Sequence, residues 1–93
     1  MKVFNWNTEK NKWLKENRGI GFEDIVFLID EGFLIDIIRN SSPNYETQKM
    51  FVIEFRLYVY LVPFVENQDE IFLKTIIPSR KATKRYLGGK KNG

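Results

Sequence analysis

Residues 49–66 read KMFVIEFRLYVYLVPFVE and contain two β-type runs that meet almost without a gap. The first run, KMFVIEFR, alternates between two faces, as a strand with one buried face does. The second run, YVYLVPFVE, is apolar on both faces and therefore predicts a central strand. Only Leu57 and Arg56 can separate the two runs, so we expect a tight hairpin. Pro63 has no N–H to donate, which predicts a bulge or an unpaired position.

The rest of the chain predicts three helices and three further strands. Asn7 or Thr8 can cap a first helix, and Gly19 suits the left-handed position that ends it. Phe22 begins a second helical pattern, and Ser79 can cap a third. The expected elements are a strand at 2–6, a helix at 8–18, a helix within 22–32, a strand at 33–39, a loop at 40–46, a strand at 71–77 and a short helix after 79.

Helices and strands segregate along the chain instead of alternating, which predicts an α+β fold. We expect a mostly antiparallel sheet of about four to five strands, with two N-terminal helices and a short C-terminal helix. At 93 residues the chain forms one domain, which would span residues 1–87 and leave 88–93 as a basic, flexible tail. The core face of the second helix would carry Phe22, Ile25, Val26 and Ile29.

The chain lacks both cysteine and histidine. Without cysteine there are no disulfides and no thiolate metal sites. Without histidine there is no His–Ser or His–Cys nucleophile pair and no imidazole to transfer protons near neutral pH. The acidic residues show no spacing like that of a calcium loop. We therefore expect neither a metal nor a cofactor.

No stretch approaches the roughly 20 apolar residues that a membrane helix requires. The start of the chain, MKVFNWNTEK, also lacks the apolar region of a secretory signal. Together with the missing cysteines, these features favour a cytoplasmic protein with no membrane partner.

The net charge of +3 conceals a strong asymmetry along the chain. Residues 71–93 hold seven basic side chains and no acidic one, whereas residues 1–70 hold eight basic and twelve acidic side chains. Such a one-sided segment favours a polyanion or an acidic protein as partner. The alternative is a charged tail that serves solubility alone.

Three segments together resemble one protein family. FNWNTEK (4–10), RGIGFEDI (18–25) and LKTIIPSRKATKRY (73–86) are similar in order and spacing to the BrnT-type toxins. In that family a Trp-Asp-x-x-Lys segment leads through a helix to Lys-His-Gly-Ile-x-Phe-Glu-Glu. A later strand ends in Ile-Ser-Ala-Arg before a basic helix that carries Ala-Thr and a Tyr. The resemblance covers about residues 3–86.

The resemblance implies a RelE-like fold and a ribonuclease toxin of a type II toxin–antitoxin system. It implies a cognate antitoxin that neutralises the toxin in a hetero-oligomer. By position, Lys10 matches the N-terminal Lys of the family, and Arg80 matches the Arg after the last strand. Lys49 falls near a basic residue that opens a sheet strand, and Arg18 stands where the family usually has His.

Three positions depart from the family pattern. Asn7 replaces the usual Asp, Leu14 replaces a usual Asn, and Asn17-Arg18 replaces Lys-His. An arginine binds phosphate well but does not act as a general base, because its pKa lies above about 12. A proton-transfer role of that His would be lost or moved here.

RNA cleavage by attack of the 2′-OH needs a group that takes its proton, cations at the phosphorane and an acid for the leaving oxygen. A lysine among other cations binds its proton less tightly, which suits Lys10 or Lys81, and the planar fork of Arg80 suits the phosphorane. The catalytic candidates are Lys10, Arg18, Arg80 and Lys81, and the RNA-binding candidates are Lys49, Lys84, Arg85 and Tyr86. This interpretation requires Lys10 and Arg80 to border one hollow.

Each candidate also has a structural alternative. Arg18 is favourable near a helix C-terminus through the helix dipole alone, and Lys49 can protect a sheet edge. Tyr86 can pack on the sheet, and Lys10 can be merely solvated. Two other functions therefore stay open: a catalytically inactive RelE-like module that binds only nucleic acid or an antitoxin, and a basic tail that docks an acidic antitoxin segment.

Overall fold

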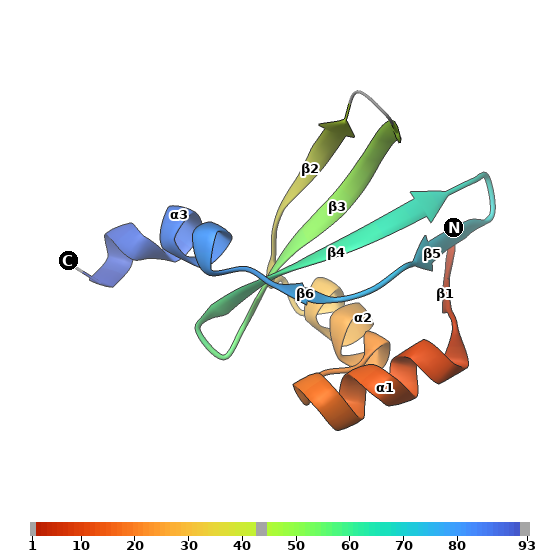
Figure 1. The fold of residues 1–93 in the computed structure, drawn as a ribbon, viewed down its shortest axis with the longest axis horizontal. Helices are drawn as coiled ribbons and strands as arrows, with labels where there is room; N and C mark the ends of the chain where they lie inside the picture. Colours follow the sequence, from red (N-terminus) through yellow and green to blue (C-terminus); the bar gives the residue numbers. More distant parts are fainter. Residues whose placement is uncertain (1, 43–44, 92–93) are drawn as a thin grey trace.

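A computed structural model describes the backbone of residues 2–42 and 45–91, and the side chains of this part except 40–47 and 89–91 (Figure 1). Nine elements follow one another along the chain. They are β1 (Val3–Trp6), α1 (Thr8–Arg18), α2 (Phe22–Asp30), β2 (Leu34–Ser42), β3 (Tyr45–Phe55), β4 (Tyr58–Glu66), β5 (Glu70–Leu73), β6 (Ile77–Pro78) and α3 (Arg80–Lys91).

The strands form one mixed sheet in the order β1-β5-β4-β3-β2, and the short β6 pairs with β4 beside β5. All neighbours are antiparallel except β1 and β5, which run parallel. The α+β class and the mostly antiparallel sheet are confirmed. The strand count is higher than the predicted four to five because the two-residue β6 adds a sixth.

The β3–β4 hairpin is as tight as predicted. Phe55 pairs with Tyr58, and the two residues between them, Arg56 and Leu57, have φ angles of 54° and 62°. Two consecutive positive φ angles match the turn whose twist suits paired strands. β4 is the central strand, since it pairs with β3, β5 and β6. Pro63 aligns with Met50, at the point where β4 changes partner from β6 to β5.

Two sequence boundaries were wrong. The strand predicted at 71–77 is interrupted, because β5 ends at Leu73 and β6 begins at Ile77. The side chain of Ile76 turns into the core between them and is fully buried. The loop predicted at 40–46 overlaps both strands, since β2 reaches Ser42 and β3 begins at Tyr45; residues 43 and 44 lie outside the described part of the chain. Cross-strand pairing of these ends has overridden the turn-forming composition.

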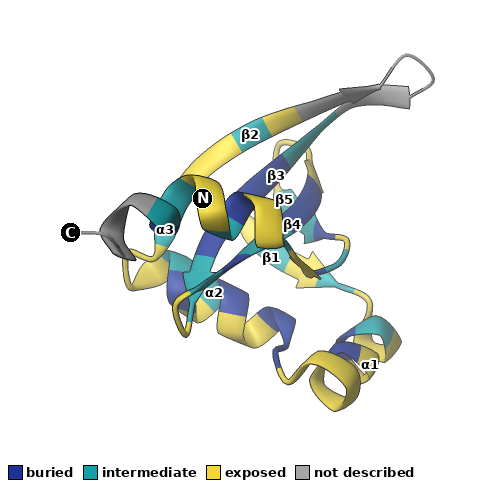
Figure 2. Cartoon of the chain, turned by 60° about the vertical axis from the view of Figure 1, so that its left-hand side comes forward, coloured by how far each residue is buried: buried dark blue, intermediate teal, exposed yellow. Residues whose placement is uncertain are grey.

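The sheet separates two hydrophobic clusters (Figure 2). The larger lies between the sheet and helices α1 and α2 and contains Leu14, Phe22, Ile25 and Phe51. The smaller lies between the sheet and α3 and contains Val52, Val59, Ala82 and Leu87. Residues next to one another in β3, such as Phe51 and Val52, serve opposite clusters because side chains alternate across a strand. The sheet therefore has helices on both faces.

The core face of α2 differs slightly from the predicted set. Phe22 and Ile25 are buried as expected, and Leu28 is buried with them. Val26 and Ile29 are only half-buried and pack at the margin of the cluster. The stripe thus follows a spacing of three residues, i, i+3 and i+6, instead of the full pattern that the sequence favoured.

Helix α1 joins α2 through a buried asparagine. Asn11 is 6% exposed, and its Oδ1 accepts the backbone N–H of Phe22 at 2.7 Å. Its Nδ2 donates to Oε1 of Glu23 at 2.9 Å. A Cβ on Gly21 would lie 2.9 Å from Oδ1 of Asn11, so a larger residue there would displace the Asn11 side chain from its hydrogen bonds. Asn11 therefore fixes the start of α2 against α1.

A carboxylate completes this junction. Glu23 also accepts Nζ of Lys15 at 2.8 Å. The hydrogen bond from Lys15, followed by that from Asn11, lowers the pKa of Glu23 to about 2. A depressed folded-state pKa stabilises the protein above about pH 5, and this contribution falls as the pH drops towards 2.

Helix α3 is held at the start of β4. Oγ of Ser79 accepts the N–H of Ala82 at 3.0 Å, which confirms the predicted cap. The N–H of Ser79 donates to the carbonyl of Val59, and Oγ1 of Thr83 accepts the N–H of Val59. The backbone of α3 continues to Lys91, four residues beyond the boundary predicted at 87.

Replacing Asn11 by alanine should lower the free energy of unfolding by about 1–3 kcal/mol, because it leaves the buried N–H of Phe22 without its acceptor. Urea denaturation measures the change. Asn17→Ala is the matched control, since Asn17 is exposed and bonds only to its own helix; its effect should stay within about 0.5 kcal/mol. Equal effects of the two changes would contradict the role of Asn11.

Replacing Leu57 by glycine should raise the free energy of unfolding by about 1 kcal/mol, because an L-residue at a φ of 62° costs about 1–2 kcal/mol. Leu57 is 79% exposed, so little packing is lost. Leu57→Ala removes the same side chain but keeps the strain, and we expect no gain from it. A stabilisation shared by both variants would show that the exposed leucine, and not the turn, is responsible.

Candidate nucleic-acid interface

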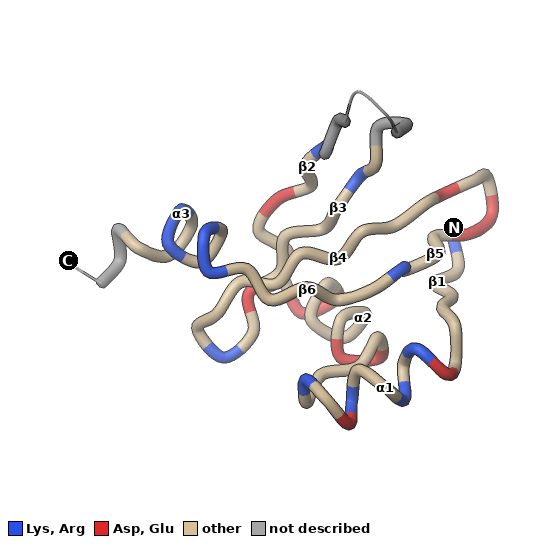
Figure 3. The backbone as a smooth tube through the Cα atoms, in the orientation of Figure 1, with Lys and Arg blue, Asp and Glu red and all other residues tan. Residues whose placement is uncertain are grey.

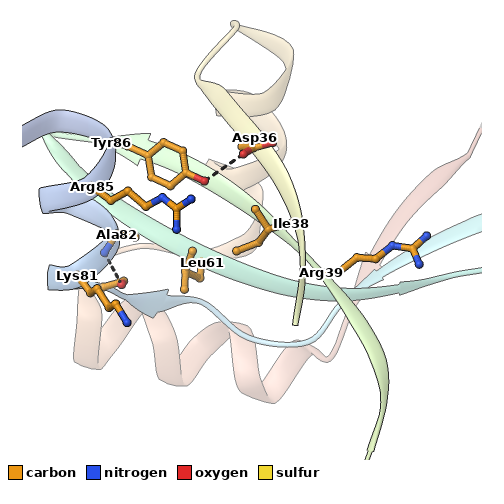
Figure 4. Close-up of a pocket in the computed structure, with 9 residues that line it drawn as sticks. Asp36, Ile38, Arg39, Leu61, Lys81, Ala82, Arg85 and Tyr86 are labelled. Carbon is orange, nitrogen blue, oxygen red and sulfur yellow. Dashed lines mark hydrogen bonds between the residues drawn. The ribbon is translucent and has the colours of Figure 1, made fainter. Parts of the chain in front are cut away.

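A hollow of about 390 Å³ lies between α3 and β2, above β4 (Figure 4). Strand β2 forms one wall, α3 forms the other, and β4 contributes the floor at Leu61. The volume falls within the range of sites that hold small ligands. The lining residues are Asp36, Ile38, Arg39, Leu61, Ser79, Lys81, Ala82, Arg85 and Tyr86.

The floor of the hollow is apolar and its border is charged. Ile38 and Leu61 pack against the smaller hydrophobic cluster and form the floor. Figure 4 shows the Arg85 side chain reaching over this floor, with Lys81 one turn earlier on the same helix. Arg39 stands at the far border, with its guanidinium directed away from α3. The arrangement offers an apolar surface beside fixed cations.

A hydrogen bond joins the two walls. The hydroxyl of Tyr86 donates to Oδ2 of Asp36 at 3.0 Å, and Oδ1 of Asp36 accepts the N–H of Ile37 at 2.8 Å. Burial, followed by the hydrogen bond and charge of Asp36, raises the pKa of Tyr86 above its usual value. Tyr86 is therefore a neutral phenol at physiological pH, a donor and not a base.

The cations of the hollow are not neutralised by ion pairs. Across the side chains that the structure describes, the ion pairs are Lys2–Glu66, Lys15–Glu23 and Lys49–Glu66. None of them involves Lys81 or Arg85. The guanidinium of Arg85 instead lies 5.8 Å from the centre of the Tyr86 ring. These charges are available to an anionic ligand.

The structure brings together only part of the site predicted from the sequence. Lys81, Arg85 and Tyr86 all line the hollow. Arg80 and Lys84 lie on the same helix and are exposed, but they are not among the lining residues. The predicted site residues that line the hollow therefore all belong to α3.

Lys10 lies apart from this helix. It belongs to α1, which packs on the opposite face of the sheet and lies at the other end of the molecule (Figures 1 and 3). Its Nζ lies 4.7 Å from the centre of the Trp13 ring. Lys10 does not line the hollow, so the two lysines proposed for proton transfer, Lys10 and Lys81, do not share a site.

Arg18 is also engaged elsewhere. Its guanidinium donates to the carbonyl of Ile76 and lies 5.2 Å from the centre of the Trp13 ring. The carbonyl of Ile76 belongs to the interruption between β5 and β6. Arg18 thus connects the end of α1 to the backbone at Ile76, whose side chain is buried in the core. This role is structural.

Lys49 forms an ion pair on the sheet. Its Nζ lies 3.0 Å from Oε1 of Glu66, and Lys2 lies 2.6 Å from the other oxygen. The hydrogen bonds from Lys2 and Lys49 lower the pKa of Glu66. Lys49 is thus already paired with Glu66, a carboxylate that it shares with Lys2.

Sequence reasoning missed the β2 wall of the hollow. Asp36 and Arg39 were treated only as parts of a strand, and Ile38 and Leu61 only as core residues. The available signal was the pair of charges in the short run LIDIIR, which an otherwise apolar strand does not require. The hydrogen-bond partner of Asp36, Tyr86, lies 50 residues later on α3, and no spacing in the sequence shows this contact.

Two expectations from the sequence concern a metal site and a membrane-spanning helix. Among residues 2–42 and 45–91, no group of three or more His, Cys, Asp or Glu side chains is placed to hold a metal ion. Over the same part of the chain, no helix has the length and apolar character needed to cross a membrane.

Comparison with known proteins adds no family. No protein-family model matches the chain, and no curated protein matches it. The functional argument therefore depends on the geometry of the hollow and on the sequence resemblance.

Replacing Arg18 by alanine should lower the free energy of unfolding by about 1–2 kcal/mol, because the carbonyl of Ile76 loses a charged donor. Thermal and urea unfolding measure the loss. Lys12→Ala, on the same helix and fully exposed, is the control and should change little. If Arg18→Ala left stability intact and removed RNA binding, Arg18 would be a ligand-binding residue and not a structural one.

Proposed function

We propose that this protein is the toxin component of a type II toxin–antitoxin system, a RelE-like endoribonuclease of the BrnT kind. Its RNA site is the hollow between α3 and β2. The observation that carries the proposal is Arg85, which extends over an apolar floor beside Lys81; among the side chains that the structure describes, no carboxylate forms an ion pair with either cation. The sequence resemblance supports the toxin proposal, although the positions that it implies, Lys10, Arg18, Lys49 and Arg80, do not line the hollow.

The hollow suits a single-stranded nucleotide. An unpaired base needs a flat or apolar surface, which Tyr86, Leu61 and Ile38 supply. The flanking phosphates need cations, and the planar fork of Arg85 matches two phosphate oxygens. Duplex RNA would offer its bases only in stacked pairs, so we expect a preference for single strands.

The hollow also holds groups for cleavage. The 2′-oxygen attacks phosphorus, its proton leaves to a base, and the 5′-oxygen departs with a proton from an acid. This leaves a 2′,3′-cyclic phosphate. Asp36 is the carboxylate that lines the hollow, and it is the candidate base. Arg85 would stabilise the phosphorane, and Lys81 would protonate the leaving oxygen.

This assignment differs from the one that the sequence favoured. Lys10 and Arg80 do not border one hollow, and Arg18 and Lys49 have structural partners. Catalysis by Lys10, Arg18, Arg80 and Lys81 as one group has no support in the geometry. The proposal therefore depends on Asp36, Lys81 and Arg85.

A second candidate function is RNA binding without cleavage. Two observations favour it. The chain has no histidine, and both oxygens of Asp36 already accept hydrogen bonds, from Tyr86 and from Ile37. With both oxygens engaged, the carboxylate must give up a hydrogen bond before it can accept the 2′ proton. Such a module would still act in the cytoplasm on RNA and would still be bound by an antitoxin.

Replacing Arg85 or Lys81 by alanine should weaken the binding of a fluorescent single-stranded RNA decamer, measured by anisotropy over a range of salt concentrations. Each lost phosphate contact should reduce the slope of log K against log salt by about 0.7. Lys12→Ala removes the same charge from α1 and should leave the slope unchanged. Equal losses in all three variants would show that only overall charge matters and would remove the hollow from the proposal.

Asp36→Asn separates the two candidate functions. For an endoribonuclease, we expect cleavage to fall by about 10²–10⁴-fold while RNA binding persists, since the amide still accepts the Tyr86 hydroxyl. Products ending in a 2′,3′-cyclic phosphate identify the reaction. Binding by the wild-type protein without cleavage, and harmless expression in bacteria, would support the second candidate instead.

A further inference from the structure

The floor of the hollow continues along the same face of the sheet. Side chains alternate along a strand, so Pro63 and Val65 of β4 share the face of Leu61. Among the described helices, α3 is the one that packs on this face, and it does so at the start of β4. The far end of β4 and its neighbour β5 lie at the other end of the sheet (Figure 1). No described helix therefore covers this face beside β5.

An aromatic ring stands on the uncovered part of the face. Phe72 of β5 is aligned with Val65 on one side and with Asn5 of β1 on the other. The next residue, Leu73, belongs to the larger hydrophobic cluster on the opposite face, so Phe72 points to the face of α3. Phe72 is half-buried and belongs to neither hydrophobic cluster, and Val65 beside it is 50% exposed. One side of the ring is therefore open to a ligand.

A cation lies between this ring and the hollow. The N–H of Lys74 donates to the carbonyl of Pro63 at 2.8 Å, so Lys74 continues the ladder beyond the end of β5 and shares the face of Phe72. Lys74 is exposed and takes part in none of the ion pairs among the described side chains. Its neighbour Pro63 lies between Leu61, on the floor of the hollow, and Val65, beside the ring. The order along the face is therefore hollow, lysine, ring.

We propose that this face provides a second base-binding position, at which an unpaired base of the RNA strand stacks on Phe72 while Lys74 binds a phosphate between that base and the hollow. Leu61 and Val65 are four residues apart on one strand, a separation of about 13 Å. Bases a few nucleotides apart in an extended strand can span this separation. Aromatic rings on open sheet faces bind unpaired bases, and such stacking accepts every base. The inference rests on the proposed function, because it takes RNA as the ligand of the hollow.

Two carboxylates on this face have partners within the chain. Asp36, in the hollow, accepts two hydrogen bonds. Oε2 of Glu70 accepts Nδ2 of Asn5 at 2.8 Å, and Glu70 lies on the side of Phe72 that faces away from Lys74. An RNA strand that runs from the hollow to the ring therefore does not pass Glu70. Cations without ion-pair partners at both places favour a polyanion over an apolar protein segment as the ligand.

The test compares two substitutions at one position. Phe72→Leu removes the ring but keeps the apolar bulk, whereas Phe72→Tyr keeps the ring. For the single-stranded RNA decamer, we expect Phe72→Leu to weaken binding about fivefold or more and Phe72→Tyr to change it by less than about twofold. Phe27→Leu is the matched control, at a 61% exposed ring on α2, and should have no effect. Lys74→Ala should reduce the slope of log K against log salt by about 0.7.

A local probe separates stacking from a structural effect. 2-Aminopurine is placed at one position of the decamer at a time, and its fluorescence is measured in the complex. Phe72→Leu should restore the fluorescence at one position, and Phe72→Tyr should restore it at none. A dinucleotide is too short to occupy both the hollow and the ring, so its affinity should not change in Phe72→Leu. A loss of dinucleotide binding would show that the substitution disturbs the hollow and would overturn the inference.

The outcomes for the two positions are distinguishable. Weaker decamer binding in both Phe72→Leu and Arg85→Ala supports the inference and the proposed function. Weaker binding in Arg85→Ala alone overturns the inference and leaves the proposed function standing. Weaker binding in Phe72→Leu alone supports a base-binding sheet face and removes the hollow from the proposed function. A dimer in sedimentation that Phe72→Leu abolishes, with unchanged affinity for RNA, overturns the inference in favour of a second copy of the chain.

Discussion

The attachment of α3 to the first residues of β4 is the constraint on which the candidate site depends. Val59 uses both of its backbone groups for this helix: its carbonyl accepts Ser79 at 3.0 Å, and its N–H donates to Thr83 at 2.8 Å. Ala82 and Leu87 then bury themselves against the same face of the sheet. The direction of the helix follows from these contacts, and so does the position of Lys81, Arg85 and Tyr86 opposite β2. Without the attachment there is no hollow, only a basic helix.

The polar and charged side chains on the two faces of the sheet differ in their contacts. On the face covered by α1 and α2, charged and polar side chains hold structure together: Asn11 fixes the start of α2, and Arg18 reaches the carbonyl of Ile76. On the face of α3, cations stand without ion-pair partners among the described side chains, over apolar residues. This contrast separates Arg18 from Arg85, although both are arginines on helices.

Local patterns in the sequence predicted most of the fold. The cap at Asn7, the left-handed Gly19 and the hairpin at Arg56-Leu57 each depend on neighbouring residues, and each was found where expected. The break between β5 and β6 could not be predicted, because it results from the burial of Ile76 and from the contact with Arg18, 58 residues away. Half of the hollow was missed for the same reason. The basic residues of its α3 wall form a continuous run that can be recognised in the sequence. Asp36 and Arg39 can be assigned to the same hollow only once the fold shows that β2 lies opposite that helix.

The parallel pairing of β1 with β5 affects how the protein folds during its synthesis. Val3 pairs with Glu70, so β1 can pair with β5 only after residues 4–70 have been synthesised. At a synthesis rate of about 5–20 residues per second, the wait is on the order of several seconds. Closing so long a loop is also slow compared with forming the local hairpin of β3 and β4. A nascent chain therefore exposes an unfinished sheet through most of its synthesis, before its last helix has been made.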